Sequence, residues 1–229
     1  TGLKRFKNVF PERFFDVGIA EPHAVTFAGG LAANGMIPVF AVYSSFLQRC
    51  YDEIIHDLSI EKQHVIIGID RAGIVGNDGA THQGLFDVAM LSSVPGITVY
   101  SPATYEELRK TLYESIYHQT GVCCVRYPRG GEEKLPAGFA PDEAWSVRSI
   151  SPKSPREKLG LVTYGKETVQ VCKAAEQLKE QGVAVSVLKL LRLLPFPENS
   201  LRPLMGCDAI LFVEEGIQSG GIGQMFGEK

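Results

Sequence analysis

The stretch HVIIGIDRAGIVGNDGATHQG, which runs from His64 to Gly84, joins an apolar run to a polar loop. The apolar run is typical of a strand that is buried on both faces of a parallel sheet. The loop, Asp70 to Gly84, places two aspartates, an arginine, a histidine, a threonine and a glutamine among four glycines. A simple connection needs far fewer polar groups, so the loop indicates a binding site at the end of a buried strand.

Strand-like and helix-like segments alternate on both sides of this stretch. Five short runs rich in Val, Ile, Phe and Tyr are expected to be strands, and longer amphipathic runs between them to be helices. Thr104 and Glu107 have capping-box spacing, and Gly35 stands where a left-handed cap ends a helix. The alternation predicts a doubly wound, mostly parallel α/β sheet. The expected strands are 13–19, 37–44, 64–70, 97–102 and 122–128, and the expected helices are 23–35, 46–62, 85–94 and 104–118.

The alternation is interrupted once and then resumes as a smaller α/β unit. Residues 131–158 are rich in Pro, Gly, Ser and charge, which favours a linker, with an edge strand expected around 145–150. We therefore expect a first domain over 1–130 and a second over 159–229. Strands are expected at 159–165, 183–195 and 208–216, and a helix at 167–182. The chain opens without methionine and ends where a helix is starting, so we expect it to be part of a longer polypeptide.

Composition is that of an ordinary globular protein. The chain has 229 residues, of which 45% are hydrophobic and 21% charged, and its formal net charge is -3. It contains no basic run, which argues against nucleic acid, and no apolar run of membrane-spanning length. The five cysteines lack CxxC spacing and are interpreted as buried thiols in a reducing compartment, so a cytoplasmic protein is expected.

Polar side chains occupy the loops that follow the expected strands. Because ligands bind beyond the carboxyl ends of parallel strands, these loops are expected to converge on one rim of the sheet. Each residue also has a structural interpretation: Glu21 suits a helix start, Arg49 can pair on its own helix, and Arg126 and Arg129 can be solvated charges. His82 stands out because its loop is rich in glycine. The rim candidates are Glu21, His23, Tyr43, Ser44, Phe46, Arg49, Arg71, Asp78, Thr81, His82, Gln83, Arg126 and Arg129.

Taken together, the loops resemble the 1-deoxy-D-xylulose-5-phosphate synthase family, thiamine diphosphate enzymes of the transketolase superfamily. The match is carried by FFDVGIAEPHAVTFAGGLA, YSSFLQRCYDEIIHD, DRAGIVGNDGATHQGLFD and VRYPRG, all between Phe14 and Gly130. Residues 159–229, with VTYG and FVEEGIQSGGIG, resemble the superfamily's C-terminal domain more generically. The resemblance implies a pyrimidine-binding domain, a truncated C-terminal domain and assembly as a homodimer.

The resemblance also implies how the cofactor is held. Glu21 matches the glutamate that hydrogen-bonds a ring nitrogen of the thiamine diphosphate pyrimidine, a catalytic role that suits a carboxyl group in a dry pocket. Phe46 matches the aromatic side chain that stacks on that ring. The family has a glutamine where Pro22 follows Glu21, and proline is tolerated at this first helical turn.

The reaction implied is condensation of pyruvate with D-glyceraldehyde 3-phosphate, which releases carbon dioxide and feeds isoprenoid and thiamine synthesis. Arg71 and Arg129 match the arginines that hold the substrate phosphate, for which a guanidinium fork is well suited. Asp78 and His82 match positions that bind substrate oxygens and assist proton movement. The matching substrate positions are Tyr43, Arg49, Arg71, Asp78, His82 and Arg129.

The family's Gly-Asp-Gly motif, which helps to hold Mg²⁺ and the cofactor diphosphate, does not occur here in a matching setting. We therefore expect no metal site in this chain, a Mg²⁺ site on an N-terminal domain outside it, and no turnover by the chain alone. Two alternatives remain open. One is the β-type subunit of a 2-oxo acid dehydrogenase or the C-terminal half of a split transketolase; the other is a non-catalytic dimerising module. The DRAG and RYPRG segments favour the synthase.

Overall fold

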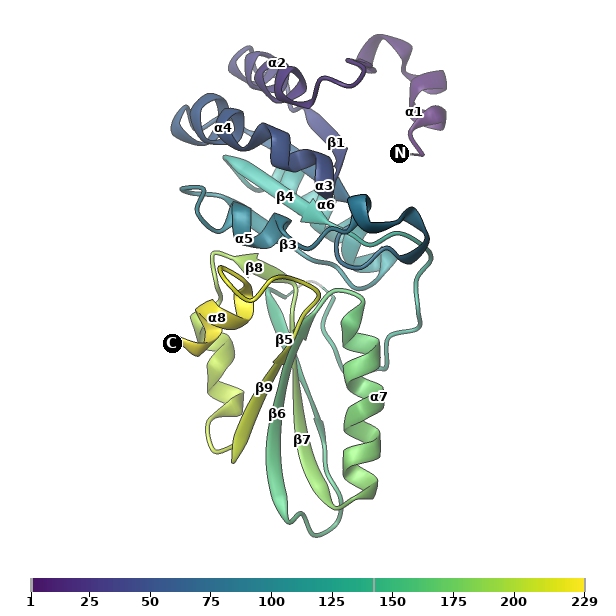
Figure 1. The fold of residues 1–229 in the computed structure, drawn as a ribbon, viewed down its shortest axis with the longest axis vertical. Coiled ribbons are helices and arrows are strands. Elements are labelled where there is room, and N and C mark those ends of the chain that lie inside the picture. Colours follow the sequence, from purple (N-terminus) through teal and green to yellow (C-terminus); the bar gives the residue numbers. More distant parts are fainter. Residues whose placement is uncertain (1, 142, 229) are drawn as a thin grey trace.

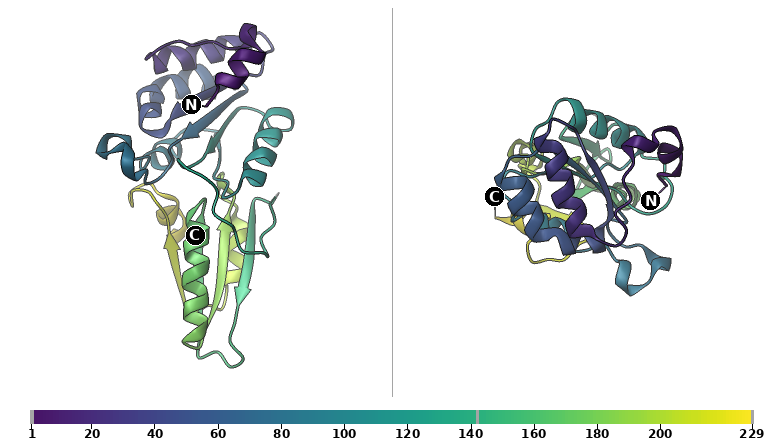
Figure 2. Two further views of the ribbon diagram at one scale, coloured as in Figure 1. Left: turned by 90° about the vertical axis from the view of Figure 1, so that its right-hand side faces the viewer. Right: turned by 90° about the horizontal axis from the view of Figure 1, so that it is seen from above.

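The computed structural model describes residues 2–141 and 143–228. They form two α/β lobes, each built on its own sheet, which are stacked along the long axis of the molecule (Figures 1 and 2). The first lobe contains the site loops and the second follows the segment that was expected to be a linker. Within these ranges every helix is too short or too polar to span a bilayer.

The first sheet has the strand order β1-β2-β4-β3-β8. Its first four strands pair in parallel, whereas β8 is antiparallel to β3. Every residue of β4 is buried, and so is every residue of β2 except the last, which explains the unbroken apolar runs in the sequence. The strands are β1 (Val39–Tyr43), β2 (Val65–Asp70), β3 (Thr98–Tyr100), β4 (Val122–Arg126) and β8 (Arg192–Leu194).

Helices cover this sheet, and two sequence-predicted caps are confirmed. Gly35 has a φ of 80°, the left-handed conformation expected after α2. Thr104 caps α6 by accepting a 3.1 Å hydrogen bond from the backbone N–H of Glu107, whose own carboxylate turns back to the N–H of Ala103. The helices are α1 (Lys4–Val9), α2 (Glu21–Ala33), α3 (Ser44–Leu47), α4 (Tyr51–Glu53), α5 (Asp87–Leu91) and α6 (Tyr105–Tyr117), with short 3-10 turns at Pro11–Arg13, Gln48–Cys50, Gly76–Asp78 and Ala80–His82.

The prediction of a strand over 13–19 was wrong. Arg13 belongs to a 3-10 turn, Gly18 has a φ of 69°, and the segment pairs with no strand among the described residues, so β1 is left as an open edge of the sheet. Ile19 is 87% exposed, and the Phe15 ring packs only edge-on against Phe27. Alternating apolar residues are compatible with a strand, but a strand also requires a hydrogen-bonded neighbour.

The segment expected as a helix over 46–62 is helical through Ile60, but it is not one regular α-helix. The chain passes through α3, a 3-10 turn and α4 into a π-helical segment at Ile54–Ile60. Cys50, Ile54 and Leu58 follow one another at intervals of four and are all fully buried. Residues four apart lie on the same face of a helix, so this spacing keeps the three side chains on the face that packs against the core.

The second lobe is a four-stranded sheet in the order β5-β7-β6-β9, with α7 packed along it (Figure 1). Its edge strand β5 lies where one was expected around 145–150, and it is antiparallel to β7. The elements are β5 (Trp145–Ile150), β6 (Glu157–Tyr164), α7 (Glu167–Glu180), β7 (Val183–Leu190), a 3-10 segment (Glu198–Leu204), β9 (Ala209–Val213) and α8 (Ile222–Gly227).

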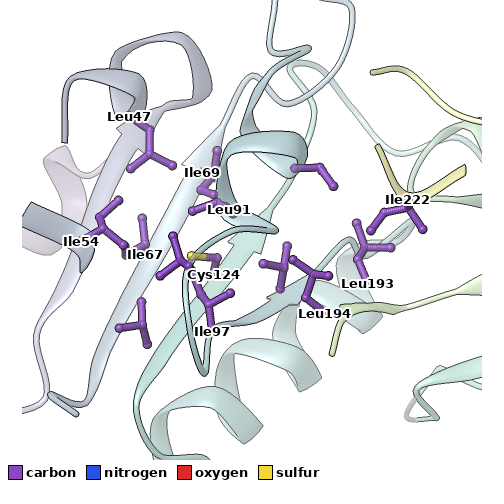
Figure 3. Packing of buried hydrophobic residues seen from close by; sticks show 14 of the residues in the cluster. Leu47, Ile54, Ile67, Ile69, Leu91, Ile97, Cys124, Leu193, Leu194 and Ile222 are labelled. Carbon is purple, nitrogen blue, oxygen red and sulfur yellow. The ribbon is translucent and has the colours of Figure 1, made fainter. Parts of the chain in front are cut away.

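The single strand expected over 183–195 is divided between the two sheets. Leu191 and Arg192 both donate backbone hydrogen bonds to the carbonyl of Ala144, after which β8 joins the first sheet. Leu193, Leu194 and Ile222 therefore pack into the same hydrophobic core as the residues of the first sheet (Figure 3). This shared core fixes the second lobe against the first, close to the carboxyl ends of the first sheet's strands.

Candidate functional site

The polar loops converge on one rim of the first sheet, as the sequence predicts. Tyr43 is the last residue of β1 and Arg126 the last of β4, while Arg71 directly follows β2. These strands are neighbours and run in parallel, so their carboxyl ends lie at one edge. The rim is therefore a product of strand order, with loops distant in sequence brought together.

Three aromatic rings form one wall of the rim. The rings of Tyr43 and Phe46 are stacked, with centroids 5.5 Å apart and an interplanar angle of 14°. The His82 ring meets Phe46 edge-on at 5.3 Å and Tyr43 at 6.4 Å. Thr81 Oγ1 lies 2.9 Å from His82 Nδ1, which orients the imidazole. Flat apolar rings with one polar edge suit a ring-shaped ligand.

A charged cluster adjoins this wall. Asp78 binds two guanidinium groups at once, with Oδ2 2.9 Å from Arg71 Nε and Oδ1 2.7 Å from Arg129 Nη1. The Arg71 guanidinium also lies 3.8 Å above the Tyr43 ring and 2.7 Å from Asp70. Burial by itself lowers the pKa of Arg71, but its hydrogen bond to Asp78 and the charge of Asp70 leave that pKa raised.

The glycine-rich loop is held in a closed shape. Gly73 and Gly84 exchange two backbone hydrogen bonds of 2.8 Å across its neck. A side chain at Gly84 would collide with the Arg71 carbonyl and would reach Ser44 Cβ at 2.9 Å, so only glycine fits there. Arg71 itself has a φ of 61°, which is unusual for a residue with a side chain. The closed neck thus imposes the backbone conformation of Arg71, which directs its side chain toward Asp78 and Tyr43.

Gln83 serves the loop itself. Its Oε1 accepts a 3.0 Å hydrogen bond from the backbone N–H of Val75, and its Nε2 donates to the carbonyl of Gly79 at 2.9 Å. His23, another rim candidate, stacks on Phe27 of its own helix. Among the described residues, no group of three His, Cys, Asp or Glu side chains is placed to hold a metal ion.

Glu21 begins α2 and presents a buried carboxylate with unused hydrogen-bonding capacity. Arg49 Nη1 lies 2.8 Å from Glu21 Oε2, but the contact lacks hydrogen-bond alignment, and this buried oxygen accepts no hydrogen bond. Only 12% of the Glu21 side chain is exposed, against 54% for Arg49. Arg49 follows Phe46 by three residues on the same helical stretch, which joins Glu21 to the aromatic wall.

Arg126 is a buried residue, so the sequence-based interpretation of it as a solvated charge was wrong. Its guanidinium forms two hydrogen bonds to Asp87, of 3.0 and 3.2 Å, and neither side chain is more than 5% exposed. On its other side lies the ring of Tyr164, whose hydroxyl donates to Glu214 at 2.7 Å. Burial raises the pKa of Tyr164, which keeps its phenol protonated as a donor. In the sequence, the signal for the buried Arg126–Asp87 pair was a charged residue at the end of a fully buried strand.

The second lobe contacts both ends of the site loop, which sequence reasoning missed. Lys166 Nζ donates to the carbonyl of Ile74 at 3.0 Å and pairs with Glu215 Oε2 at 3.1 Å. The Glu215 carboxylate lies directly over Gly73, where any side chain would displace it. At the other end, Ile217 N–H donates to the carbonyl of Leu85 at 3.2 Å. A small, partly open pocket of about 20 Å³ lies at the lobe contact beside Arg126 and Tyr164.

Family models match both lobes. Residues 1–132 match the transketolase pyrimidine-binding domain, and residues 150–228 match the transketolase C-terminal domain. Among curated proteins, the chain is 44% identical over 224 residues to the 1-deoxy-D-xylulose-5-phosphate synthase of Clostridium kluyveri, and 42% identical over 225 residues to that of Aquifex aeolicus. Each alignment covers 97% of this chain but 35% of the relative, so the chain spans about a third of the curated relatives' length.

Solved structures agree with this assignment. A split-gene transketolase described as an inactive β4 tetramer superposes with a TM-score of 0.84 at 27% identity, over all of this chain and 75% of that one. A transketolase variant from Pichia stipitis has a TM-score of 0.76 over 92% of this chain and 35% of that one, and at 19% identity this is a likeness of fold alone. The fold, the rim and the two family-model matches together show that the chain belongs to the transketolase family, as a pyrimidine-binding domain joined to a C-terminal domain.

Proposed function

We propose that this chain contributes the pyrimidine-binding and phosphate-binding parts of a 1-deoxy-D-xylulose-5-phosphate synthase. The assembled enzyme would condense pyruvate with D-glyceraldehyde 3-phosphate and release carbon dioxide. The identity of 42–44% to these synthases over 97% of the chain supports a synthase rather than another member of the transketolase family. The observation that carries the proposal is the buried Glu21 oxygen that accepts no hydrogen bond. A bound ring with a nitrogen donor would satisfy it.

The rim fits the aminopyrimidine of thiamine diphosphate. Glu21 would hydrogen-bond a ring nitrogen through Oε2, which accepts no hydrogen bond, and Phe46 would stack on the ring face, backed by Tyr43. A carboxyl group in a partly dry pocket can hold or pass on the proton in that bond. When bound, thiamine diphosphate supplies the electron sink for decarboxylation.

The charged cluster fits a phosphorylated substrate. Arg71 and Arg129 would each present a guanidinium edge to the phosphate of D-glyceraldehyde 3-phosphate, and Asp78 holds both in position. His82, whose ring meets Phe46 edge-on, would transfer protons to and from the substrate's oxygens together with Asp78. Tyr43 and Arg49 complete the proposed substrate set.

The chain would require a second component. The Mg²⁺ and diphosphate site would lie on an N-terminal domain outside this chain, and the active assembly would be a homodimer in the cytoplasm. The chain would consist of a domain over 1–130, a linker over 131–158 and a domain over 159–229. Limited proteolysis tests that division, because cleavage would concentrate between the two domains.

The test combines this chain with the N-terminal segment of the Clostridium kluyveri relative that precedes the matched region. We expect 1-deoxy-D-xylulose 5-phosphate to form only when both polypeptides, thiamine diphosphate and Mg²⁺ are present. Glu21→Gln should reduce turnover by more than about 100-fold, because the amide cannot exchange a proton with the ring nitrogen. Glu106→Gln, at an exposed residue of α6 that pairs with Lys110, is the matched control.

Three results would contradict parts of the proposal. Product formation by the purified chain alone would show that the second component is not required. Transfer from a ketose phosphate donor, with no use of pyruvate, would favour the split-transketolase alternative. Full activity of Glu21→Gln would remove the role given to that carboxylate.

A further inference from the structure

A second hollow lies outside the rim, where α6 meets β8 and the chain around Ala144. Its volume is about 450 Å³, which falls among pockets that take small molecules, roughly 300–1,000 Å³. It shares no lining residue with the aromatic wall or the charged cluster described above. The lining residues that matter here are Tyr100, Arg109, Lys110, Thr111, Tyr113 and Arg192.

Two buried polar atoms in this groove have no hydrogen-bond partner. One is Thr111 Oγ1, on a side chain that is 3% exposed, and the other is Arg192 Nε. Buried hydroxyl and guanidinium groups are nearly always paired, because they lose their hydrogen bonds to water on burial. Thr111 lies on α6 and Arg192 begins β8, the strand that the chain adds to the first sheet after β7, so a single partner for both would join α6 to β8.

The charges of the groove favour an anion. Lys110 is paired with Glu106 at 3.1 Å, but within residues 2–141 and 143–228 neither Arg109 nor Arg192 has a carboxylate within ion-pair distance. Free guanidinium groups bind carboxylate and phosphate oxygens strongly. The groove also contains Glu114 and Glu143, which would repel a ligand of high negative charge.

The remaining walls are apolar faces. Tyr100 of β3 and Tyr113 of α6 line the groove, and Leu191, just before β8, lines it as well. Such surfaces give a ligand's carbon body a place to pack once its charged end is bound.

We propose that this groove is a binding site for a small organic anion, one phosphate or carboxylate group on a flat apolar body. Arg192 Nε and the Thr111 hydroxyl bind the anionic oxygens, Arg109 adds charge at the mouth, and the tyrosine rings flank the body. The site is independent of the function proposed for the rim. Because its two anchors come from α6 and β8, an occupied groove holds that helix against the edge strand and raises the stability of the chain.

The test is a titration of the chain with phenyl phosphate and with benzoate, followed by calorimetry and by backbone amide NMR shifts. It is run in the Arg129→Gln background, which weakens any binding of the same probes at the rim. We expect one equivalent to bind, with shifts grouped at 100–119 and 191–192 and a raised Tm. Arg192→Gln should weaken binding about tenfold and Thr111→Val about threefold.

Controls separate the parts of the proposal. Arg202→Gln changes an exposed arginine of the second lobe outside the groove and should leave the affinity unchanged. If Arg192→Gln or Thr111→Val does not fold, Arg109→Gln on the exposed face of α6 tests the charge and should weaken binding about threefold. Comparison of the two probes decides between phosphate and carboxylate as the anionic group.

Three outcomes would overturn the proposal. The first is that millimolar phenyl phosphate or benzoate causes no NMR shifts in the groove. The second is that benzyl alcohol, which carries no charge, binds as tightly as these probes. The third is that inorganic phosphate, which has no apolar body, binds as tightly as they do.

Discussion

Lys166 of the second lobe donates a 3.0 Å hydrogen bond to the carbonyl oxygen of Ile74, inside the site loop of the first lobe. The two residues are far apart in sequence, and the contact exists because β8 and the shared core bring the lobes together. Glu215 braces the lysine at 3.1 Å and covers Gly73 at the neck of the loop. Lys166 and Glu215 of the second lobe thus help to hold the site loop of the first lobe in its shape.

Lys166→Met should loosen the site loop while leaving the fold intact. The change removes one hydrogen bond and the charge that opposes Glu215, together about 1 kcal/mol, so amide hydrogen exchange over 73–84 should become roughly fivefold faster. Lys173→Met is the matched control, because Lys173 pairs only with the exposed Glu133. Unchanged exchange in the Lys166 variant would mean that the loop closes without the second lobe.

Under the proposed function, Asp78→Asn should weaken binding of the phosphorylated substrate in the assembled enzyme. The carboxylate holds Arg71 and Arg129 at 2.9 and 2.7 Å, and without its charge the half-exposed Arg129 is free to move into solvent. We expect the KM for D-glyceraldehyde 3-phosphate to rise about tenfold and the KM for pyruvate to stay the same. An equal rise in both KM values would count against a phosphate site at this cluster.

Asp87→Asn should destabilise the chain by about 3–5 kcal/mol, because it leaves the Arg126 guanidinium buried without a counter-charge. Replacing both residues, as Asp87→Leu with Arg126→Met, should recover most of that loss, since no buried charge remains. Urea denaturation measures both variants. Glu106→Gln, which breaks an exposed pair, should cost less than about 1 kcal/mol, and a similar small cost for Asp87→Asn would contradict the buried-pair interpretation.

Local patterns predict much of this molecule because they reflect local causes. The run HVIIGID is apolar throughout because both faces of β2 are covered, and Thr104 caps α6 through an atom three residues away. The rim was predictable for a similar reason. Parallel strands align their carboxyl ends, so residues as distant as Tyr43 and Arg129 belong to one site once the strands are identified.

The errors arose where a distant partner decides the structure. Residues 13–19 alternate like a strand but find no neighbour, and the run that ends at Leu194 changes sheets at Leu191 because Ala144 and β3 offer backbone hydrogen bonds there. The contacts of Lys166 and Glu215 with the loop have no local signal at all, since they depend on how the two lobes pack.

The cysteines predict how the chain responds to alkali. Burial raises the pKa of the Cys50 thiol to about 12 and that of Cys123 to about 11, from an ordinary 9.0. The raised values belong to the folded state, so their stabilising effect is present below pH 9 and is lost as the pH rises toward 11 and 12. The free energy of unfolding should therefore fall above pH 9, by on the order of 1 kcal/mol per thiol per pH unit.

Two measurements check this. Iodoacetamide at pH 8 should modify Cys207 first, because it is the one cysteine that is not fully buried, while intact mass records four further adducts only in denaturant. Urea denaturation between pH 8 and 10.5 should then show a smaller alkaline loss for the double variant Cys50→Ala, Cys123→Ala than for the parent chain. An identical slope in both proteins would mean that other buried groups, such as the Tyr127 phenol with its pKa raised to about 12 by burial, cause the loss.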